Sequence, residues 1–304
     1  MRTVKEKKSL VVLARRRIGS TRRLLRAARE RGFASRLIDP ADCATFVQGR
    51  TSRLVRRGKA VRPVDVVIPR LVGLAPHAIS VLHHFELSGA RVLNAAEAIV
   101  KSRHTMHSLQ FLAHHGIGVS RTVMGRDARS VRRLVELVGG LPTLLRVMRG
   151  GRRRATMVCE TPESLEAALE VLLGLGQDIL VQRYLRPSER DVRLLVVGGK
   201  VVCAVERRPQ AGRVTRSLGA GARYSSIVPA SKAVEVAEAT AALLGLEVAA
   251  VDMIDRGGVP KVFEVDVSPP LLPLERATGL DLAGTIVDWA VSAPQGWRGA
   301  TAPV

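Results

Sequence analysis

Short apolar segments alternate with helical patterns along the first ninety residues, and this alternation limits the possible folds more than any other feature. Apolar runs of strand length lie at 9–14, 34–39 and 64–69, and helical patterns lie at 20–32 and 76–89. Strands that are separated by helices form a parallel sheet with helices on both faces. The sequence therefore predicts an α/β fold that begins with a small parallel sheet.

The rest of the chain continues this mixed pattern. Asn94 can cap a long helix that runs through His115 and stops at Gly116. The dipeptide Gly198-Gly199 is typical of a two-residue hairpin turn between strands. Further strands are expected at 119–124, 143–148, 191–197, 201–206, 248–254 and 261–267, and further helices at 128–138, 231–246 and 281–293.

The chain is strongly basic. It carries 48 Lys and Arg residues against 27 Asp and Glu, a formal charge of +21 over 304 residues. A chain of this length corresponds to about two domains, each able to bury a core. The charge favours polyanionic partners, namely nucleic acid, nucleotide phosphates or an acidic peptide. Two Trp, two Tyr and five Phe are too few for a binding surface built from stacked aromatic rings.

Two further classes of protein are excluded. The longest apolar runs fall far short of the roughly 20 residues that span a membrane, and the run after the basic N-terminal residues is too short for a secretory signal. Cys43, Cys159 and Cys203 lie far apart and form neither a disulfide framework nor a metal-binding spacing. We therefore expect a cytoplasmic protein with reduced thiols and no membrane partner.

Three carboxylates lie on two neighbouring strands that are predicted near the C-terminus. Side chains alternate along a strand, so Glu264 and Asp266 should point to one face of the sheet and Phe263 to the other. Asp252, on the adjacent strand, can lie beside them. Adjacent carboxylates repel one another unless a positive group joins them, and a divalent cation such as Mg²⁺ meets this need. The alternative is a solvated sheet face that carries acids.

A second cluster is cationic. Arg146 lies on a predicted strand, and Gly150-Gly151 permits a tight turn before Arg152–Arg154. A hairpin of this kind can close over phosphates or hold a nucleic-acid backbone. An exposed, charged hairpin tip is the alternative interpretation.

Several segments of the chain occur in a characteristic order. They are VIPR (67–70), HFELSGARVLNAAEAI (84–99), ILVQRYL (179–185), DVRLLVVGGKVVCAVERR (191–208), AAVDMI (249–254), FEVDVSPP (263–270) and TGLDLAG (278–284). Taken together, these segments resemble the RimK branch of the ATP-grasp ligases, from about residue 8 to residue 292.

The resemblance implies an ATP-grasp fold, in which two α+β lobes close on a nucleotide after a small parallel-sheet α/β domain. The N-terminal domain would cover 1–95, the central lobe 96–185 and the C-terminal lobe 186–304. Members of the family use ATP to join a carboxylate to an amine through an acylphosphate. We therefore expect ATP and Mg²⁺ as cofactors, with Mn²⁺ as a substitute for Mg²⁺. The expected partners are an amino acid such as glutamate, an acidic peptide or protein acceptor, nucleic acid, and further copies of the chain in a homo-oligomer.

The resemblance also implies individual site residues. Asp252, Glu264 and Asp266 match the family's metal ligands. Arg207 and Arg216 are the expected catalytic residues, because positive charge stabilises a phosphoryl group in transfer. The expected nucleotide-binding residues are Arg146, Arg183, Tyr184, Asp191, Arg216 and Ser217.

Four phosphate-handling elements depart from the family pattern. Thr105 and Arg146 stand where the family has Lys, and the glycine-rich lid reads GGRRRA. The family's Arg-x-Asn segment is Thr215-Arg216-Ser217. Arginine binds phosphate through a bidentate fork, so the additional arginines can replace lost cationic contacts.

Two functions are therefore open. An active ATP-dependent carboxylate–amine ligase would use the three acids and the arginine-rich phosphate contacts. A non-catalytic relative would use the same scaffold to bind nucleic acid or an acidic peptide. The two hypotheses differ at Glu264, which the ligase needs and a binding protein does not.

Overall fold

The computed structural model describes residues 8–15, 19–71, 76–125, 131–149, 152–184, 190–208 and 222–292. The predicted parallel sheet is present and has the order β2-β1-β6-β7. Along β1, Leu10 and Val12 pack against helix α1, whereas Val11 and Leu13 pack on the side of helix α2. The helices therefore cover both faces, as the alternation of strands and helices predicts. These elements are β1 (Ser9–Leu13), α1 (Gly19–Glu30), β2 (Ala34–Ile38), β6 (Val66–Pro69), α2 (Pro76–Leu87) and β7 (Arg91–Val92).

Three strands that follow β2 and precede β6 in the sequence form a second, antiparallel sheet, which was not predicted. It has the order β3-β4-β5 and follows a short 3-10 helix, η1 (Pro40–Asp42). Every residue of β3 after Cys43 is exposed, so the strand has no buried face to produce an apolar alternation. The strands are β3 (Cys43–Gln48), β4 (Thr51–Arg56) and β5 (Lys59–Ala60).

The prediction of a single long helix capped by Asn94 is wrong in two respects. The segment forms two helices, α3 (Ala96–Ser102) and α4 (Thr105–His114). Asn94 does not cap α3: its Oδ1 accepts hydrogen bonds from the backbone N–H groups of Glu247 and Val248 at 2.8 and 2.7 Å, and its Nδ2 donates to the Val248 carbonyl at 2.7 Å. The side chain therefore joins the N-terminal domain to the start of strand β15.

The central lobe is an antiparallel sheet with the order β10-β9-β11-β8 and two helices, α5 and α6. Its own core forms where α6 residues such as Leu165 pack on Leu145 and Ile179 of the sheet. Helix α6 begins with a capping box, in which Thr161 and Ser164 bond each other's backbone N–H groups. The elements are β8 (Thr122–Met124), α5 (Val131–Val138), β9 (Thr143–Arg149), β10 (Arg152–Cys159), α6 (Pro162–Gly174) and β11 (Asp178–Arg183).

The C-terminal lobe is a five-stranded antiparallel sheet with the order β14-β13-β12-β15-β16. The predicted hairpin at Gly198-Gly199 is confirmed, and both glycines have positive φ, 61° and 78°. A Cβ on Gly198 would lie 2.6 Å from the ring of Trp289, so this turn has no room for a side chain. The elements are β12 (Arg190–Val197), β13 (Lys200–Arg208), β14 (Arg223–Ser226), α7 (Ser231–Leu244), β15 (Val248–Arg256), β16 (Val259–Asp266), α8 (Leu271–Thr278) and α9 (Leu282–Ser292).

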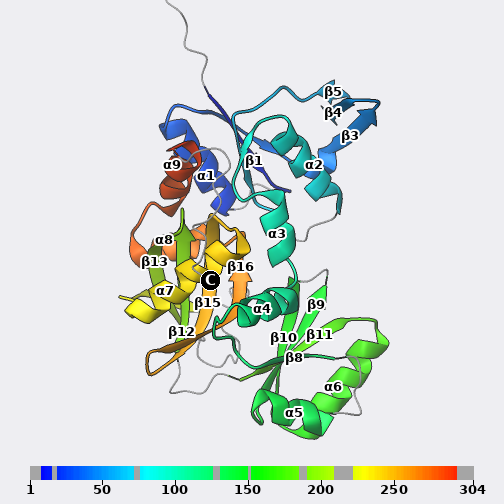
Figure 1. The fold of residues 1–304 in the computed structure, drawn as a ribbon, viewed down its shortest axis with the longest axis vertical. Helices are drawn as coiled ribbons and strands as arrows, with labels where there is room; N and C mark the ends of the chain where they lie inside the picture. The colour runs from blue at the N-terminus through cyan, green and yellow to red at the C-terminus, as the bar shows by residue number, and fades with distance from the viewer. Residues whose placement is uncertain are drawn as a thin grey trace, which may run out of the picture.

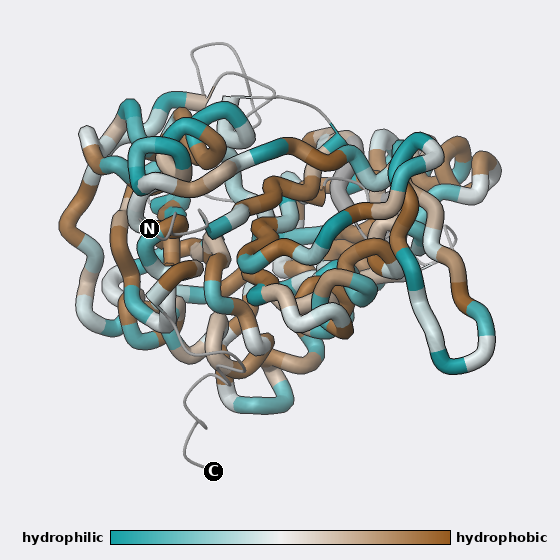
Figure 2. Tube along the Cα trace, turned by 90° about the horizontal axis from the view of Figure 1, so that it is seen from above, coloured by the Kyte–Doolittle hydropathy of each residue, from teal (hydrophilic) through white to brown (hydrophobic). Residues whose placement is uncertain are grey.

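The last helices fold back onto the N-terminal domain. Helix α9 lies beside α1 (Figure 1), and Arg31 bonds both oxygens of the Asp288 carboxylate, at 2.5 and 2.8 Å. A buried ion pair joins Arg91 to Glu247, and the indole N–H of Trp289 donates to the same Glu247 carboxylate at 2.8 Å. Figure 2 shows the hydrophobic stretches running through the interior of the molecule. Of the helices in the described ranges, none has the length and apolar content needed to cross a bilayer.

We expect Asn94→Ala to lower the free energy of unfolding by about 2–4 kcal/mol, because two buried backbone N–H groups lose their acceptor. Urea denaturation measures this value. Gln110→Ala, on the exposed side of α4, is the control and should change it by less than about 0.5 kcal/mol. Equal values for the two variants would contradict the role of Asn94 as the link between domains.

Candidate active site

Asp252 lies at the centre of a buried ionic network on the C-terminal sheet. It is fully buried on β15, directly opposite Arg193 of β12, which donates to its two oxygens at 2.6 and 2.7 Å. Arg207 of β13 donates to Asp252 at 3.0 Å and to Asp191, its own cross-strand partner, at 2.6 and 2.9 Å. Strand register thus builds a chain of alternating charges across three strands.

The charges in this network stabilise one another. Burial alone would lower the pKa of Arg193, but the charge and hydrogen bonds of Asp252 outweigh it and raise the pKa well above its ordinary value. Burial has the same effect on Arg207, and the charges of Asp191 and Asp252 again raise the pKa of the guanidinium. Both arginines are therefore fixed cations in the floor of the site.

Glu264 connects this network to the central lobe. It lies opposite Asp252 on β16, and its Oε2 accepts a hydrogen bond from Arg146 of β9 at 3.2 Å. The Arg146 side chain is 6% exposed and that of Glu264 is 18% exposed, so the ion pair is largely shielded from water. This pair spans the two ATP-grasp lobes.

The expected orientation of Phe263 is wrong. A β-bulge interrupts the pairing of β15 with β16 between Asp252 and the next residue, so strict alternation does not hold there. The Phe263 ring packs against Ile254, and its centroid lies 5.3 Å from the guanidinium carbon of Arg146 and 5.7 Å from that of Arg207. Phe263 therefore lies in the site together with Glu264.

The positive charge that the carboxylates require is supplied by arginine. Arg193 and Arg207 hold Asp252, Arg146 holds Glu264, and the Oδ1 of Asp266 accepts the Ser268 N–H at 3.0 Å. Among the residues that the structure describes, no three Asp, Glu, His or Cys side chains form a group that could hold an ion. The oxygen donors have the chemistry that Mg²⁺ prefers, but charge balance alone no longer demands a metal.

A cavity of about 590 Å³ lies between the end of β11 and the β15–β16 hairpin. Arg183 and Arg121 line it from the central lobe, and Ile254, Arg256 and Lys261 line it from the C-terminal lobe. Ile254 also contacts Phe263, so the cavity and the ionic network share one face of the sheet. Four cations around a partly apolar floor suit an anionic ligand that has a flat apolar part.

The segment before β8 fixes the relative position of the two lobes at this cavity. The N–H of Ser120 donates to the Val262 carbonyl at 2.8 Å, and the N–H of Val262 donates to the Gly118 carbonyl at 2.9 Å. These bonds attach the segment alongside strand β16. Arg183, the last residue of β11, donates its N–H to the Arg121 carbonyl at 3.2 Å, and Tyr184 follows directly after the strand.

The predicted site residues fall into three groups. The structure joins Arg207 to Asp191 and Asp252, and it joins Arg146 to Glu264, which lies opposite Asp252 on the next strand. It places Arg183 at the cavity and Thr105 at the first position of α4. Arg216, Ser217 and Gly150-Gly151 lie outside the described residues, and so do the side chains of Arg152–Arg154, although their backbone forms the predicted hairpin strand.

Two site residues were not predicted individually. Arg193 lies two residues after Asp191 on one strand, and the period of two in a strand would have placed both on one face. Tyr224, on β14, lies opposite Arg207, and burial raises the pKa of its hydroxyl against the opposing charges of Arg193 and Arg207. Within the described ranges, the Tyr224 Oη and the Arg193 Nη1 are buried without a hydrogen-bond partner, as expected of groups that receive a ligand.

We expect Asp252→Asn to lower the free energy of unfolding by about 3–5 kcal/mol, because two buried guanidinium groups lose their counter-charge. Chemical denaturation followed by circular dichroism gives the value. The control is Asp255→Asn, three residues along the same strand, where the amide oxygen can still accept the Gly258 N–H and the loss should stay below about 0.5 kcal/mol. A small loss at Asp252 would show that the network does not support the sheet.

Family models match almost the whole chain. The model of the RimK PreATP-grasp domain matches residues 9–99, and that of the RimK-like ATP-grasp domain matches residues 102–290. A protein of Serratia proteamaculans named "Probable alpha-L-glutamate ligase" is 37% identical over 274 residues, which cover 89% of this chain and 91% of that protein. A protein of Shewanella amazonensis named "Probable alpha-L-glutamate ligase 1" is 35% identical, with 88% and 90% covered.

Solved structures share the fold. The ATP-grasp ligase PsnB in complex with its minimal precursor superposes with a TM-score of 0.74 at 20% identity, over 94% of this chain and 99% of that one. A RimK domain ATP-grasp protein of Sphaerobacter thermophilus gives a TM-score of 0.69 at 21% identity, over 93% and 99%. With the sheet order, the interlobe ion pair and the family matches, the chain belongs to the RimK-like ATP-grasp family of ATP-dependent ligases.

Proposed function

We propose that the chain uses ATP and Mg²⁺ to add glutamate, or a similar amino acid, to a carboxylate of an acidic peptide or protein. The ion pair between Arg146 and Glu264 supports this proposal most strongly, because it joins a buried cation of the β8–β11 sheet to a carboxylate of the β12–β16 sheet. The names of the relatives, which are 37% and 35% identical, support the glutamate ligase assignment. They do not favour the alternative of a non-catalytic protein that binds a polyanion.

The nucleotide would bind across the interlobe cavity. Its base would rest on Ile254 and Phe263 near the hinge at Arg183 and Tyr184, and its phosphates would extend toward Arg146. A bidentate guanidinium suits a phosphate oxygen pair. The structure of PsnB with minimal precursor, Mg and ADP, which has a TM-score of 0.71, supports a nucleotide and Mg²⁺ as ligands.

The reaction needs no covalent protein nucleophile. The acceptor carboxylate would attack the γ-phosphorus of ATP, forming an oxygen–phosphorus bond as ADP leaves. The amine of the incoming amino acid would then attack the acyl carbon, lose a proton and displace phosphate. The protein would supply positioning and positive charge, which is the larger part of catalysis in phosphoryl transfer.

Particular residues would carry these roles. Asp252, Glu264 and Asp266 are held by Arg193 and Arg207, by Arg146 and by the Ser268 N–H, and they form no ion-binding group among the described residues. Mg²⁺ would therefore enter on the phosphates of ATP, where its charge offsets theirs. Arg207 is held in place by Asp191 and Asp252 and would stabilise the charge that develops on the transferred group. Arg216 would assist it, in the segment outside the described residues.

The test is ADP release by the purified protein with Mg²⁺, ATP, glutamate and an acidic peptide acceptor. We expect Mg²⁺-dependent release, and Arg146→Met should lower kcat/KM by about 10- to 100-fold, the equivalent of one charge-assisted contact. Arg146→Lys should retain an intermediate rate because it keeps the charge.

Arg276→Met, an exposed residue of α8, is the matched control and should leave the rate unchanged. Absence of ADP release from a broad panel of amino acids and acidic acceptors, by a protein that still binds MgATP, would overturn the proposed function.

A further inference from the structure

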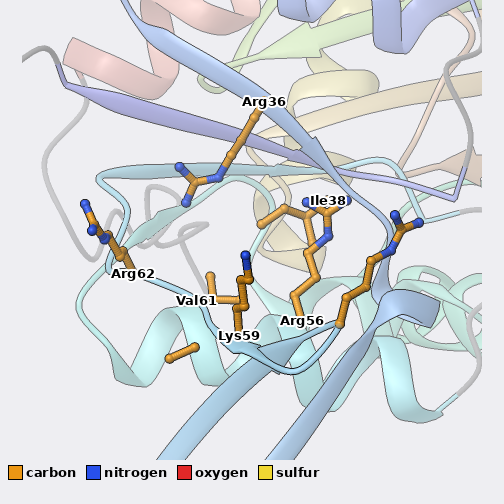
Figure 3. Close-up of a pocket in the computed structure, with 8 residues that line it drawn as sticks. Arg36, Ile38, Arg56, Lys59, Val61 and Arg62 are labelled. Carbon is orange, nitrogen blue, oxygen red and sulfur yellow. The ribbon is translucent and has the colours of Figure 1, made fainter.

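A second cationic site lies on the N-terminal domain, away from the interlobe cleft. A pocket of about 480 Å³ is formed by residues of β2 and of the segment from β4 through β5. Figure 3 shows Arg36 and Lys59 pointing toward one another across it. The cationic residues that line it are Arg36, Arg56, Arg57, Lys59 and Arg62, and the apolar ones are Ile38, Ala60 and Val61.

The pocket has far more positive than negative charge. Asp42 bonds Arg56 at 3.4 Å and Arg57 at 3.0 Å. Within the described ranges, the side chains of the remaining three cations, Arg36, Lys59 and Arg62, take part in no ion pair or hydrogen bond. Neighbouring like charges without counter-charges are stabilised by a bound anion.

The backbone at the pocket is held in a disfavoured conformation. Arg57 has a φ of 47°, and it is the one non-glycine residue with positive φ in the described part of the chain. It precedes Gly58 in the tight turn between β4 and β5, where asparagine or glycine is the common choice. A bulky residue in the left-handed region is unusual, and such strain is concentrated at functional sites. The turn keeps an arginine at the pocket despite this conformational disadvantage.

Residues from the edge strands of two sheets line this pocket. Strand β2, which carries Arg36, is the edge of the parallel sheet, and β5, which carries Lys59, is the edge of the antiparallel sheet. An extended peptide can add to a strand edge through backbone hydrogen bonds, while its side chains enter adjacent pockets. Among the residues that the structure describes, no aromatic side chain lines the pocket to stack on a nucleobase. These features favour a peptide over a single-stranded nucleic acid.

We propose that this pocket binds an extended acidic peptide, with Glu or Asp side chains of the peptide paired to Arg36, Lys59 and Arg62. The proposed peptide binding does not depend on the proposed ligase function. Its role, as a place that holds a glutamate-rich acceptor or product while the reaction proceeds between the lobes, rests on the proposed ligase function. Because the pocket is separate from Arg146 and Glu264, loss of one site should leave the other intact.

The test is fluorescence anisotropy with a labelled oligoglutamate peptide at low salt. We expect the combined variant Arg36→Ala, Lys59→Ala, Arg62→Ala to weaken binding by at least about tenfold, since three exposed charge contacts are removed. The control variant, Arg22→Ala, Arg29→Ala, Arg276→Ala, removes the same charge from exposed positions on α1 and α8 and should weaken binding by less than about threefold.

Equal weakening in both variants would overturn the proposal, because it would show that net charge alone attracts the peptide. Tighter binding of an RNA oligonucleotide than of oligoglutamate, lost in the pocket variant only, would overturn it in favour of a nucleic-acid site. Arg146→Met should bind oligoglutamate like the wild type. If it does, and the wild type releases no ADP, the pocket proposal holds and the ligase proposal fails.

Discussion

The buried carboxylate of Asp252 is the constraint on which the site depends. It lies on β15, and the two arginines that hold it come from β12 and β13, the next two strands on one side of β15 in the sheet order. A buried charge without partners is strongly unfavourable, so these strands keep their register to satisfy it. That same register places Glu264 opposite Asp252 and presents it to the central lobe. The fold and the geometry of the cleft thus have a common electrostatic cause.

Basic residues of the chain gather in two separate places, the interlobe cleft and the N-terminal pocket, and the chemistry of the two differs. In the cleft, arginines are buried and paired to carboxylates, so their positions are fixed by the protein itself. In the N-terminal pocket, the side chains of three exposed cations have no ionic partner in the described ranges and are accessible to an anionic ligand. The resemblance predicts lysine at positions 105 and 146, and of the two residues that stand there, Thr105 and Arg146, only Arg146 keeps a positive charge in the cleft.

Sequence patterns predict well the elements that have one buried face. The parallel sheet, the hairpin at Gly198 and the acidic strand pair follow from apolar periodicity and turn chemistry. Sequence patterns fail for β3, because its exposed residues show no apolar periodicity. Sequence patterns also fail at Asn94, because its side chain bonds backbone groups that lie more than 150 residues away in the chain.

Prediction of the site from the sequence has the same limits. The motifs identified Asp191, Arg207, Asp252 and Glu264, and the structure joins them, but no motif shows that arginines rather than a cation balance the acids. The bulge that turns Phe263 into the cleft is a local break in strand pairing, which residue alternation cannot detect. The N-terminal pocket has no motif at all, because it forms only where two sheet edges approach each other.

Thermal unfolding with and without MgATP most directly tests whether a nucleotide and its metal bind between the lobes at Arg146 and Glu264. A ligand at a hundred times its dissociation constant stabilises the native state by about 2.7 kcal/mol. We expect the unfolding midpoint of the wild type to rise with MgATP, to rise less with ATP and a chelator, and to stay nearly constant for Glu264→Gln. No rise at millimolar MgATP, or an equal rise in the variant, would contradict the nucleotide site.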